Sequence, residues 1–194
     1  MTISNRIKLG MWLRKHETSL SVAQSLNKLV YTTTGSIHVL PDFLIIGAAR
    51  SGTTSLYQYL TEHPSIIPGV GKEIYFFDKK FKKGINWYKS FFPTKFSMAI
   101  TKNRQKTKCI TGEATPRYLH YPHAPKRIFQ LLPKIKLIVL LRNPIDRAYS
   151  HYQMEVSSGN EELSFEESIK KEEERTKEIM EKMQDDENFY SVYF

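Results

Sequence analysis

The chain has one cysteine, Cys109, among its 194 residues. This excludes an intrachain disulfide and a multi-cysteine zinc site, and it fits a reducing compartment. No apolar run approaches the ~18 residues that a membrane-spanning helix needs. Residues 1–40 also lack the apolar core and small-residue cleavage site of a signal peptide. We therefore expect a soluble, cytoplasmic protein with no transmembrane segment.

Negative charge is scarce over most of the chain. Residues 155–194 hold 13 acidic and 5 basic residues, a balance of −8, and residues 1–154 hold 7 acidic and 24 basic residues, a balance of +17. A block this basic attracts polyanions such as nucleic acid, anionic lipid, a nucleotide or an acidic glycan, and charge alone does not choose among them. The length and the 40% apolar content fit one globular domain with a sizeable core.

Residues 1–40 are predicted to be an extension that precedes a domain at 41–194, because a polar break at 32–35 separates the two. Residues 6–15 interleave basic side chains with apolar ones, including Trp12. One interpretation is a basic amphipathic helix at a membrane surface, which would make the protein peripheral to a membrane. The alternatives are a helix packed on the domain and a loosely ordered tail.

A phosphate-binding loop is predicted at 47–52, although it lacks the usual lysine. Residues 43–46 are typical of a buried parallel strand, and a helix is expected from Thr53. A strand, a small-residue loop and a helix start direct backbone N–H groups and the helix dipole at an anion. The spacing of Gly47 and Gly52 matches a nucleotide P-loop, but Thr53 and Thr54 stand where Lys-Ser/Thr would be. The loop therefore suits a phosphate better than a triphosphate with Mg²⁺; an ordinary strand-to-helix turn is the alternative.

The rest of the chain alternates between strand and helix patterns. Strands are predicted at 66–68, 108–113 and 136–141, the last one central, and helices at 85–92, 121–132, from 144, and 164–184. The helix at 121–132 is expected to bury Ile128, Leu131 and Leu132. The alternation predicts an α/β fold, a three-layer sandwich around a central parallel sheet.

Ligands of such sheets bind at the carboxyl ends of the strands, which predicts that Arg50, Glu113 and Arg142 share one rim. Ser150 follows Arg142 by eight residues, about two helical turns, so its hydroxyl can face back toward the strand end. An arginine and a hydroxyl make a good receptor for a second phosphate. The alternative is an ion pair of Arg142 with Asp146 and a solvent-facing Ser150.

Glu73 is the candidate general base. It precedes the aromatic residues Tyr75, Phe76 and Phe77, and a carboxylate beside an aromatic cluster can take up a proton. The alternative is a surface glutamate paired with Lys72.

Two phosphate receptors and a base describe a donor with a 5′-phosphosulfate and a separate 3′-phosphate. The chain resembles the sulfotransferases that use 3′-phosphoadenosine 5′-phosphosulfate (PAPS), particularly the glycan type: heparan sulfate N- and 3-O-sulfotransferases and their bacterial relatives. Residues 46–56 are similar to the 5′-phosphosulfate loop and residues 140–152 to the 3′-phosphate motif. Residues 72–78, 84–88 and 112–118 are similar to segments that line the family's active site.

The resemblance implies a P-loop NTPase-like sulfotransferase fold, PAPS as donor without a metal, a glycan or small-molecule acceptor, and no nucleic-acid partner. It implies Glu73 and Arg50 as catalytic residues. The implied donor-binding residues are Arg50, Ser51, Gly52, Thr53, Thr54, Ser55, Arg142 and Ser150. Because family members continue with further strands, we expect the domain at 41–194 to lack its C-terminal part. The alternative functions are a P-loop kinase or NTPase and a non-catalytic polyanion binder.

Overall fold

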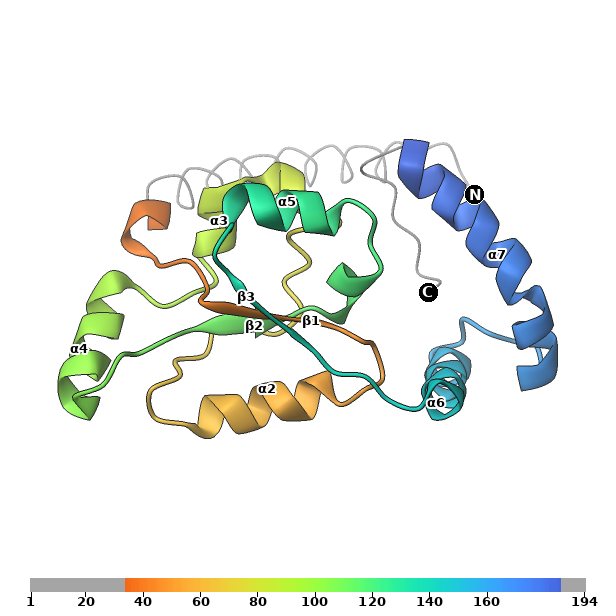
Figure 1. Cartoon of the computed structure of the whole chain (residues 1–194), viewed down its shortest axis with the longest axis horizontal. Helices are drawn as coiled ribbons and strands as arrows, with labels where there is room; N and C mark the ends of the chain where they lie inside the picture. The colour runs from red at the N-terminus through yellow and green to blue at the C-terminus, as the bar shows by residue number, and fades with distance from the viewer. Residues whose placement is uncertain (1–33, 186–194) are drawn as a thin grey trace, which may run out of the picture.

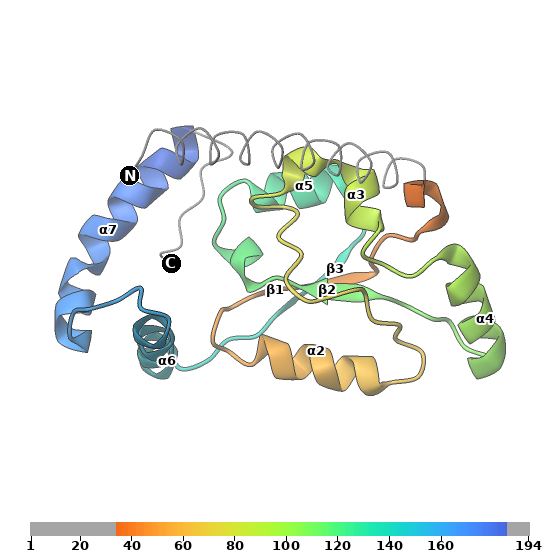
Figure 2. The same cartoon turned by 180° about the vertical axis from the view of Figure 1, so that it is seen from behind.

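The computed structural model describes residues 34–185, in which a parallel sheet lies between two layers of helices (Figure 1). The strands are β1 (Phe43–Gly47), β2 (Gly112–Ala114) and β3 (Lys136–Val139), in the order β2-β1-β3. Both strand pairs are parallel. The helix α2 (Thr53–Glu62) covers one face, and α3 (Ile85–Lys89) and α5 (Ala124–Leu131) lie on the other (Figures 1 and 2). The predicted three-layer α/β architecture is confirmed.

Three further helices lie at the two ends of the sheet: α4 (Lys95–Gln105) at one end, and α6 (Pro144–Ser157) and α7 (Phe165–Asp185) at the other (Figure 1). Short 3-10 turns are η1 (Gly35–Ile37), η2 (Phe81–Lys83) and η3 (Pro116–Leu119). A capping box starts α7, where Glu167 N donates to Ser164 Oγ at 3.3 Å and Ser164 N donates to Glu167 Oε2 at 3.0 Å.

Alternation along β1 divides the core between the two faces of the sheet. Leu44 points to the α3 and α5 side, where it joins a buried cluster that includes Phe76, Tyr88 and Tyr118. Its neighbour Ile45 points to the α2 side and packs in a cluster with Tyr57. The sheet is thus buried on both faces at β1, as expected for a parallel strand with a continuous apolar sequence.

Several predicted details are wrong. β1 is the central strand, and β3 is an edge strand of the described sheet, with Leu137 50% and Val139 44% exposed. Leu137 and Val139 are exposed because Ile138 faces the α2-side cluster, and the alternate side chains of a strand point away from that face. Leu131 is exposed although Ile128 and Leu132 are buried as predicted.

Other element boundaries also differ from the prediction. In place of the strand expected at 108–113, the structure has only the short strand β2 at its end. In place of the strand expected at 66–68, it has a single parallel bridge between Ile66 and Ile110. The helix α4 was not predicted from the sequence. The proposed helix at 6–15 lies outside the described residues.

Candidate functional site

The predicted phosphate loop lies at the carboxyl end of β1 and leads directly into α2. Gly52 is the N-cap of α2 and has a φ of 89°, which favours glycine, and no side chain caps this end of the helix. The first-turn N–H groups are therefore left for a ligand, and the helix dipole adds positive potential at the same point. Arg50 has a φ of 64°, an uncommon left-handed conformation for a non-glycine residue.

Arg50 connects this loop to α6. Its Nε donates to Ser150 Oγ at 3.1 Å, and its Nη1 lies 3.6 Å from the sulfur of Met154. From the other side, Arg142 Nη1 donates to the backbone oxygen of Arg50 at 3.3 Å. The two predicted phosphate receptors, at Arg50 and at Arg142, are 92 residues apart in the sequence. They are neighbours in one site of the structure.

Glu73 is held beside the loop by contacts with Ala114, Lys72 and Tyr75. Its backbone N–H donates to Ala114 O at the end of β2 at 3.1 Å. Its carboxylate forms an ion pair with Lys72 at 3.1 Å and accepts a hydrogen bond from the Tyr75 hydroxyl. Lys72 Nζ also donates to Thr54 Oγ1. An ammonium group thus reaches the loop from a separate segment, where the sequence after Gly52 supplies none.

These residues enclose a cleft of about 510 Å³. The predicted site residues that line it are Arg50, Gly52, Thr53, Thr54, Ser55, Glu73, Arg142 and Ser150. Ser51 is the exception: it does not line the cleft, and its hydroxyl is buried without a hydrogen-bond partner in the part of the chain that the structure describes. A cleft of this size is in the range of small-molecule sites.

Glu113 does not lie on the rim, contrary to the prediction. It is buried and accepts hydrogen bonds from Tyr88 (2.5 Å), Thr115 (3.0 Å) and Tyr118 (3.2 Å). Burial raises its pKa to about 7, and these hydrogen bonds oppose the rise. The Tyr118 hydroxyl also accepts from Phe76 N at 2.9 Å. Glu113 therefore stabilises, through Tyr118, the segment that contains Glu73.

Several residues that line the cleft were not predicted as site residues, and four of them carry ionisable side chains of basic or acidic type: Arg117, His120, His151 and Glu155. His151 Nε2 lies 3.4 Å from Glu155 Oε1, and burial lowers the pKa of His151 and lowers that of His120 to about 4. The imidazole of His120 is therefore neutral at pH 7, and burial favours the neutral form of His151, although Glu155 opposes this. His151 directly follows Ser150 in the sequence, so its position was a usable signal, whereas no pattern indicated His120.

The side chains of the cleft suit phosphate groups. Arg50 and Arg142 offer guanidinium groups and the start of α2 offers backbone N–H groups. Lys72 does not line the cleft itself, but its ammonium group bonds to Thr54, which does. Among residues 34–185, no three His, Cys, Asp or Glu side chains gather as metal ligands. Within the same range, no helix has the length and apolar character needed to span a bilayer.

Comparison with known proteins places this geometry in a family. The model of the sulfotransferase domain matches residues 40–194. Over 120 residues the chain is 43% identical to mouse bifunctional heparan sulfate N-deacetylase/N-sulfotransferase 4, covering 59% of this chain and 13% of that protein. It is 38% identical over 117 residues to human heparan sulfate glucosamine 3-O-sulfotransferase 6, covering 60% and 31% of the two chains.

A solved structure agrees with these matches. The crystal structure of a sulfotransferase from Alicyclobacillus acidocaldarius superposes with a TM-score of 0.54 at 36% identity, covering 72% of this chain and 60% of that one. The chain thus spans less than two thirds of the length of each of these three proteins. The family match and the structural match indicate the same kind of domain. The chain belongs to the sulfotransferase domain family.

Proposed function

We propose that this chain transfers a sulfuryl group from PAPS to a hydroxyl or amine of a saccharide. The observation that carries the proposal is the position of Arg50, which joins the phosphate loop to Ser150 on α6 and contacts Arg142. One cleft therefore offers cationic and N–H donors at two places, as a donor with separate 5′- and 3′-phosphates requires.

The residues of the cleft fit such a donor. The N–H groups at the start of α2, with Thr53, Thr54 and Ser55, are assigned to the 5′-phosphosulfate. Arg142 and Ser150 are assigned to the 3′-phosphate, and Arg50 lies between the two groups. Ser51 is assigned a structural part in the loop, because its hydroxyl is buried away from the cleft.

Glu73 is proposed to accept the proton of the acceptor group. Its carboxylate is oriented by Lys72 and Tyr75, and its backbone is anchored on β2. The acceptor oxygen or nitrogen forms a bond to sulfur while the bond from sulfur to the bridging oxygen breaks. Arg50, Lys72 and the loop N–H groups stabilise the negative charge that develops on the departing phosphate, as preorganised donors do.

A saccharide acceptor rests on the names of the relatives, both of which act on heparan sulfate according to those names. The structure offers a compatible surface: Lys79 Nζ lies 4.1 Å from the centre of the Tyr75 ring, next to Glu73. An aromatic ring with nearby cations suits an anionic sugar. We assign the domain to 41–194, which the family match supports, and a cytoplasmic location, which the buried free thiol of Cys109 supports.

The test is transfer of labelled sulfate from PAPS to an unsulfated or N-desulfated heparan-type polysaccharide. Glu73→Gln is expected to abolish transfer and to leave binding of 3′-phosphoadenosine 5′-phosphate (PAP) largely intact. Glu62→Gln, an exposed glutamate at the end of α2, is the matched control and is expected to retain transfer.

Two results would contradict the proposal. Equal loss of transfer and PAP binding in Glu73→Gln would remove the assignment of Glu73 as base. Mg²⁺-dependent turnover of ATP, without transfer from PAPS, would instead identify a P-loop kinase or NTPase.

A further inference from the structure

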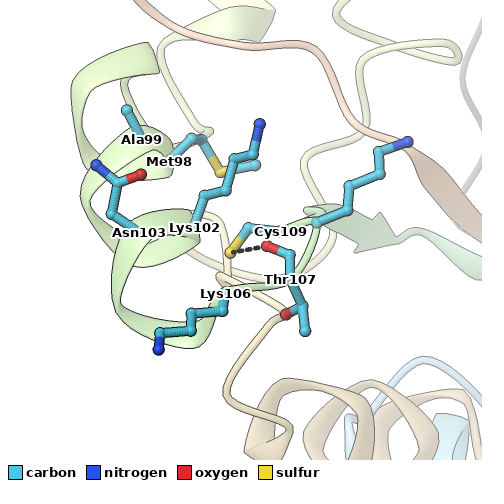
Figure 3. A pocket seen from close by; sticks show the side chains of 8 residues that line it. Met98, Ala99, Lys102, Asn103, Lys106, Thr107 and Cys109 are labelled. Carbon is cyan, nitrogen blue, oxygen red and sulfur yellow. Dashed lines mark hydrogen bonds between the residues drawn. The ribbon is translucent and has the colours of Figure 1, made fainter.

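The helix α4 stands apart from the core at the end of the molecule opposite α6 (Figures 1 and 2). It buries none of its residues. A cavity of about 620 Å³ lies between its inner side, including Met98 and Lys102, and the segment of Thr107 and Cys109 (Figure 3). Core packing therefore does not explain the apolar side chains of this helix.

Two of these apolar side chains are directed outward. Phe96 is 75% exposed and Ile100 is 44% exposed. They are four residues apart, so they lie on one face of the helix. A phenylalanine and an isoleucine side by side in water leave apolar area unburied, which favours a surface that is covered in use.

The charge around this apolar pair has a single sign. Residues 95–108 contain five basic and no acidic residues, and all five are exposed: Lys95, Lys102, Arg104, Lys106 and Lys108. Of these five residues, only Lys108 has an acidic partner among the described residues: its Nζ lies 4.0 Å from Asp42 Oδ1. Lys108 also lines an adjoining cavity with Lys134 and Lys136, so the basic surface continues onto the start of β3.

We propose that α4 binds an anionic lipid membrane through the exposed pair Phe96 and Ile100 together with the five basic residues of 95–108, three of which (Lys102, Lys106 and Lys108) line the cavity beside the helix. Basic side chains around exposed aromatic and aliphatic ones are the pattern of helices that lie in a membrane interface. An anionic polysaccharide would depend mainly on the cations, whereas a lipid surface also takes up both side chains of the apolar pair. The cleft is lined by Ser150 and Met154 of α6, and α6 lies at the end of the sheet opposite α4 (Figure 1), so a membrane at α4 leaves the cleft open to solution.

The test is co-sedimentation of the full chain with vesicles at physiological salt. We expect binding to vesicles of phosphatidylcholine with phosphatidylserine and little binding to phosphatidylcholine alone. Lys102→Gln/Arg104→Gln/Lys106→Gln is expected to weaken binding on the order of 100-fold, from the contribution of each cation near an anionic surface. The matched control, Lys82→Gln/Lys83→Gln/Lys126→Gln, removes three exposed lysines elsewhere and is expected to weaken it less than about tenfold.

A second variant tests the apolar part of the surface. Phe96→Ser/Ile100→Ser keeps every charge and is expected to weaken vesicle binding at least about tenfold while leaving heparin binding unchanged. All variants retain residues 1–33. Undiminished vesicle binding of the charge variant would therefore overturn the proposal, and heparin binding without vesicle binding would replace the membrane by a sulfated polysaccharide.

Discussion

Arg50 combines a functional side chain with an unfavourable backbone conformation, so Arg50→Gly and Arg50→Ala should differ in stability while weakening donor binding equally. Its φ of 64° lies in the left-handed region, which is unfavourable for residues with a Cβ. Its guanidinium group lines the donor cleft and donates to Ser150. Arg50→Gly removes both features, whereas Arg50→Ala removes the guanidinium group and keeps the Cβ.

The magnitudes follow from these two features. A left-handed conformation costs roughly 1–2 kcal/mol for an L-residue. Glycine avoids this cost but lowers stability by about 0.4–1 kcal/mol, because it raises the entropy of the unfolded chain. The free energy of unfolding of Arg50→Gly should thus be about 1 kcal/mol higher than that of Arg50→Ala. Both variants lose the same hydrogen bond to Ser150, so this loss cancels in the comparison. Loss of a hydrogen bond to a charged phosphate should weaken PAP by about 1.5–3 kcal/mol in both variants.

Urea unfolding followed by fluorescence measures the first difference, and calorimetric titration of PAP measures the second. Arg50→Gly that is no more stable than Arg50→Ala would refute the argument from backbone strain. Unchanged PAP affinity in both variants would refute the placement of Arg50 in the donor site.

Three further predictions concern other parts of the molecule. Arg142→Ala should weaken PAP by about 1.5–3 kcal/mol, while Arg104→Ala on α4 should not; equal effects would mean a non-specific charge effect. The pKa of Glu113 is raised by burial from 4.5 to about 7, so the folded state keeps a proton that the unfolded state releases. The stability from this group is complete below about pH 4.5 and is lost as the pH rises through 7, by about 3 kcal/mol. The difference in unfolding free energy between parent and Glu113→Gln should therefore fall by this amount over that range, and a flat difference would contradict it. Thr94 caps α4 by accepting from Ser97 N at 3.1 Å, so Thr94→Ala should lower the hydrogen-exchange protection of α4 amides about fivefold; a uniform loss across the sheet would show that α4 is part of the core after all.

The phosphate loop could be predicted from the sequence because its signals are local. An apolar run, a small-residue loop and a helix start follow one another within 43–62, and the structure places β1 and α2 there. The edge position of β3 could not be predicted in the same way. Its apolar run indicates burial, but the sequence of a strand does not state which strands lie beside it.

Glu113 shows how alternation decides the direction of a side chain. The prediction placed it on the rim because it lies near the end of a strand. In the register, Glu113 pairs with Leu44, so its side chain points to the α3 and α5 side, among tyrosines. The adjacent residue Ala114 ends the strand and anchors Glu73 through its carbonyl oxygen.

The arrangement around Glu73 could not be predicted because it depends on tertiary contacts and on unusual backbone angles. Glu73 and Tyr75 have φ values of 61° and 58°, which allow both side chains to meet over the cleft. Such conformations persist only where surrounding contacts enforce them. The hydrogen bond from Lys72 to Thr54 spans 18 residues, and it completes a loop that appeared deficient in the sequence.

The central claim is that one cleft holds both phosphates of the donor, with Arg50 between them. Calorimetric titration of PAP, with ADP as control and a chelator present, tests it directly. We expect saturable binding of PAP without metal and binding of ADP at least about tenfold weaker, because ADP lacks the 3′-phosphate that Arg142 and Ser150 are proposed to hold. Equal affinity for the two nucleotides, or PAP binding that requires Mg²⁺, would contradict it.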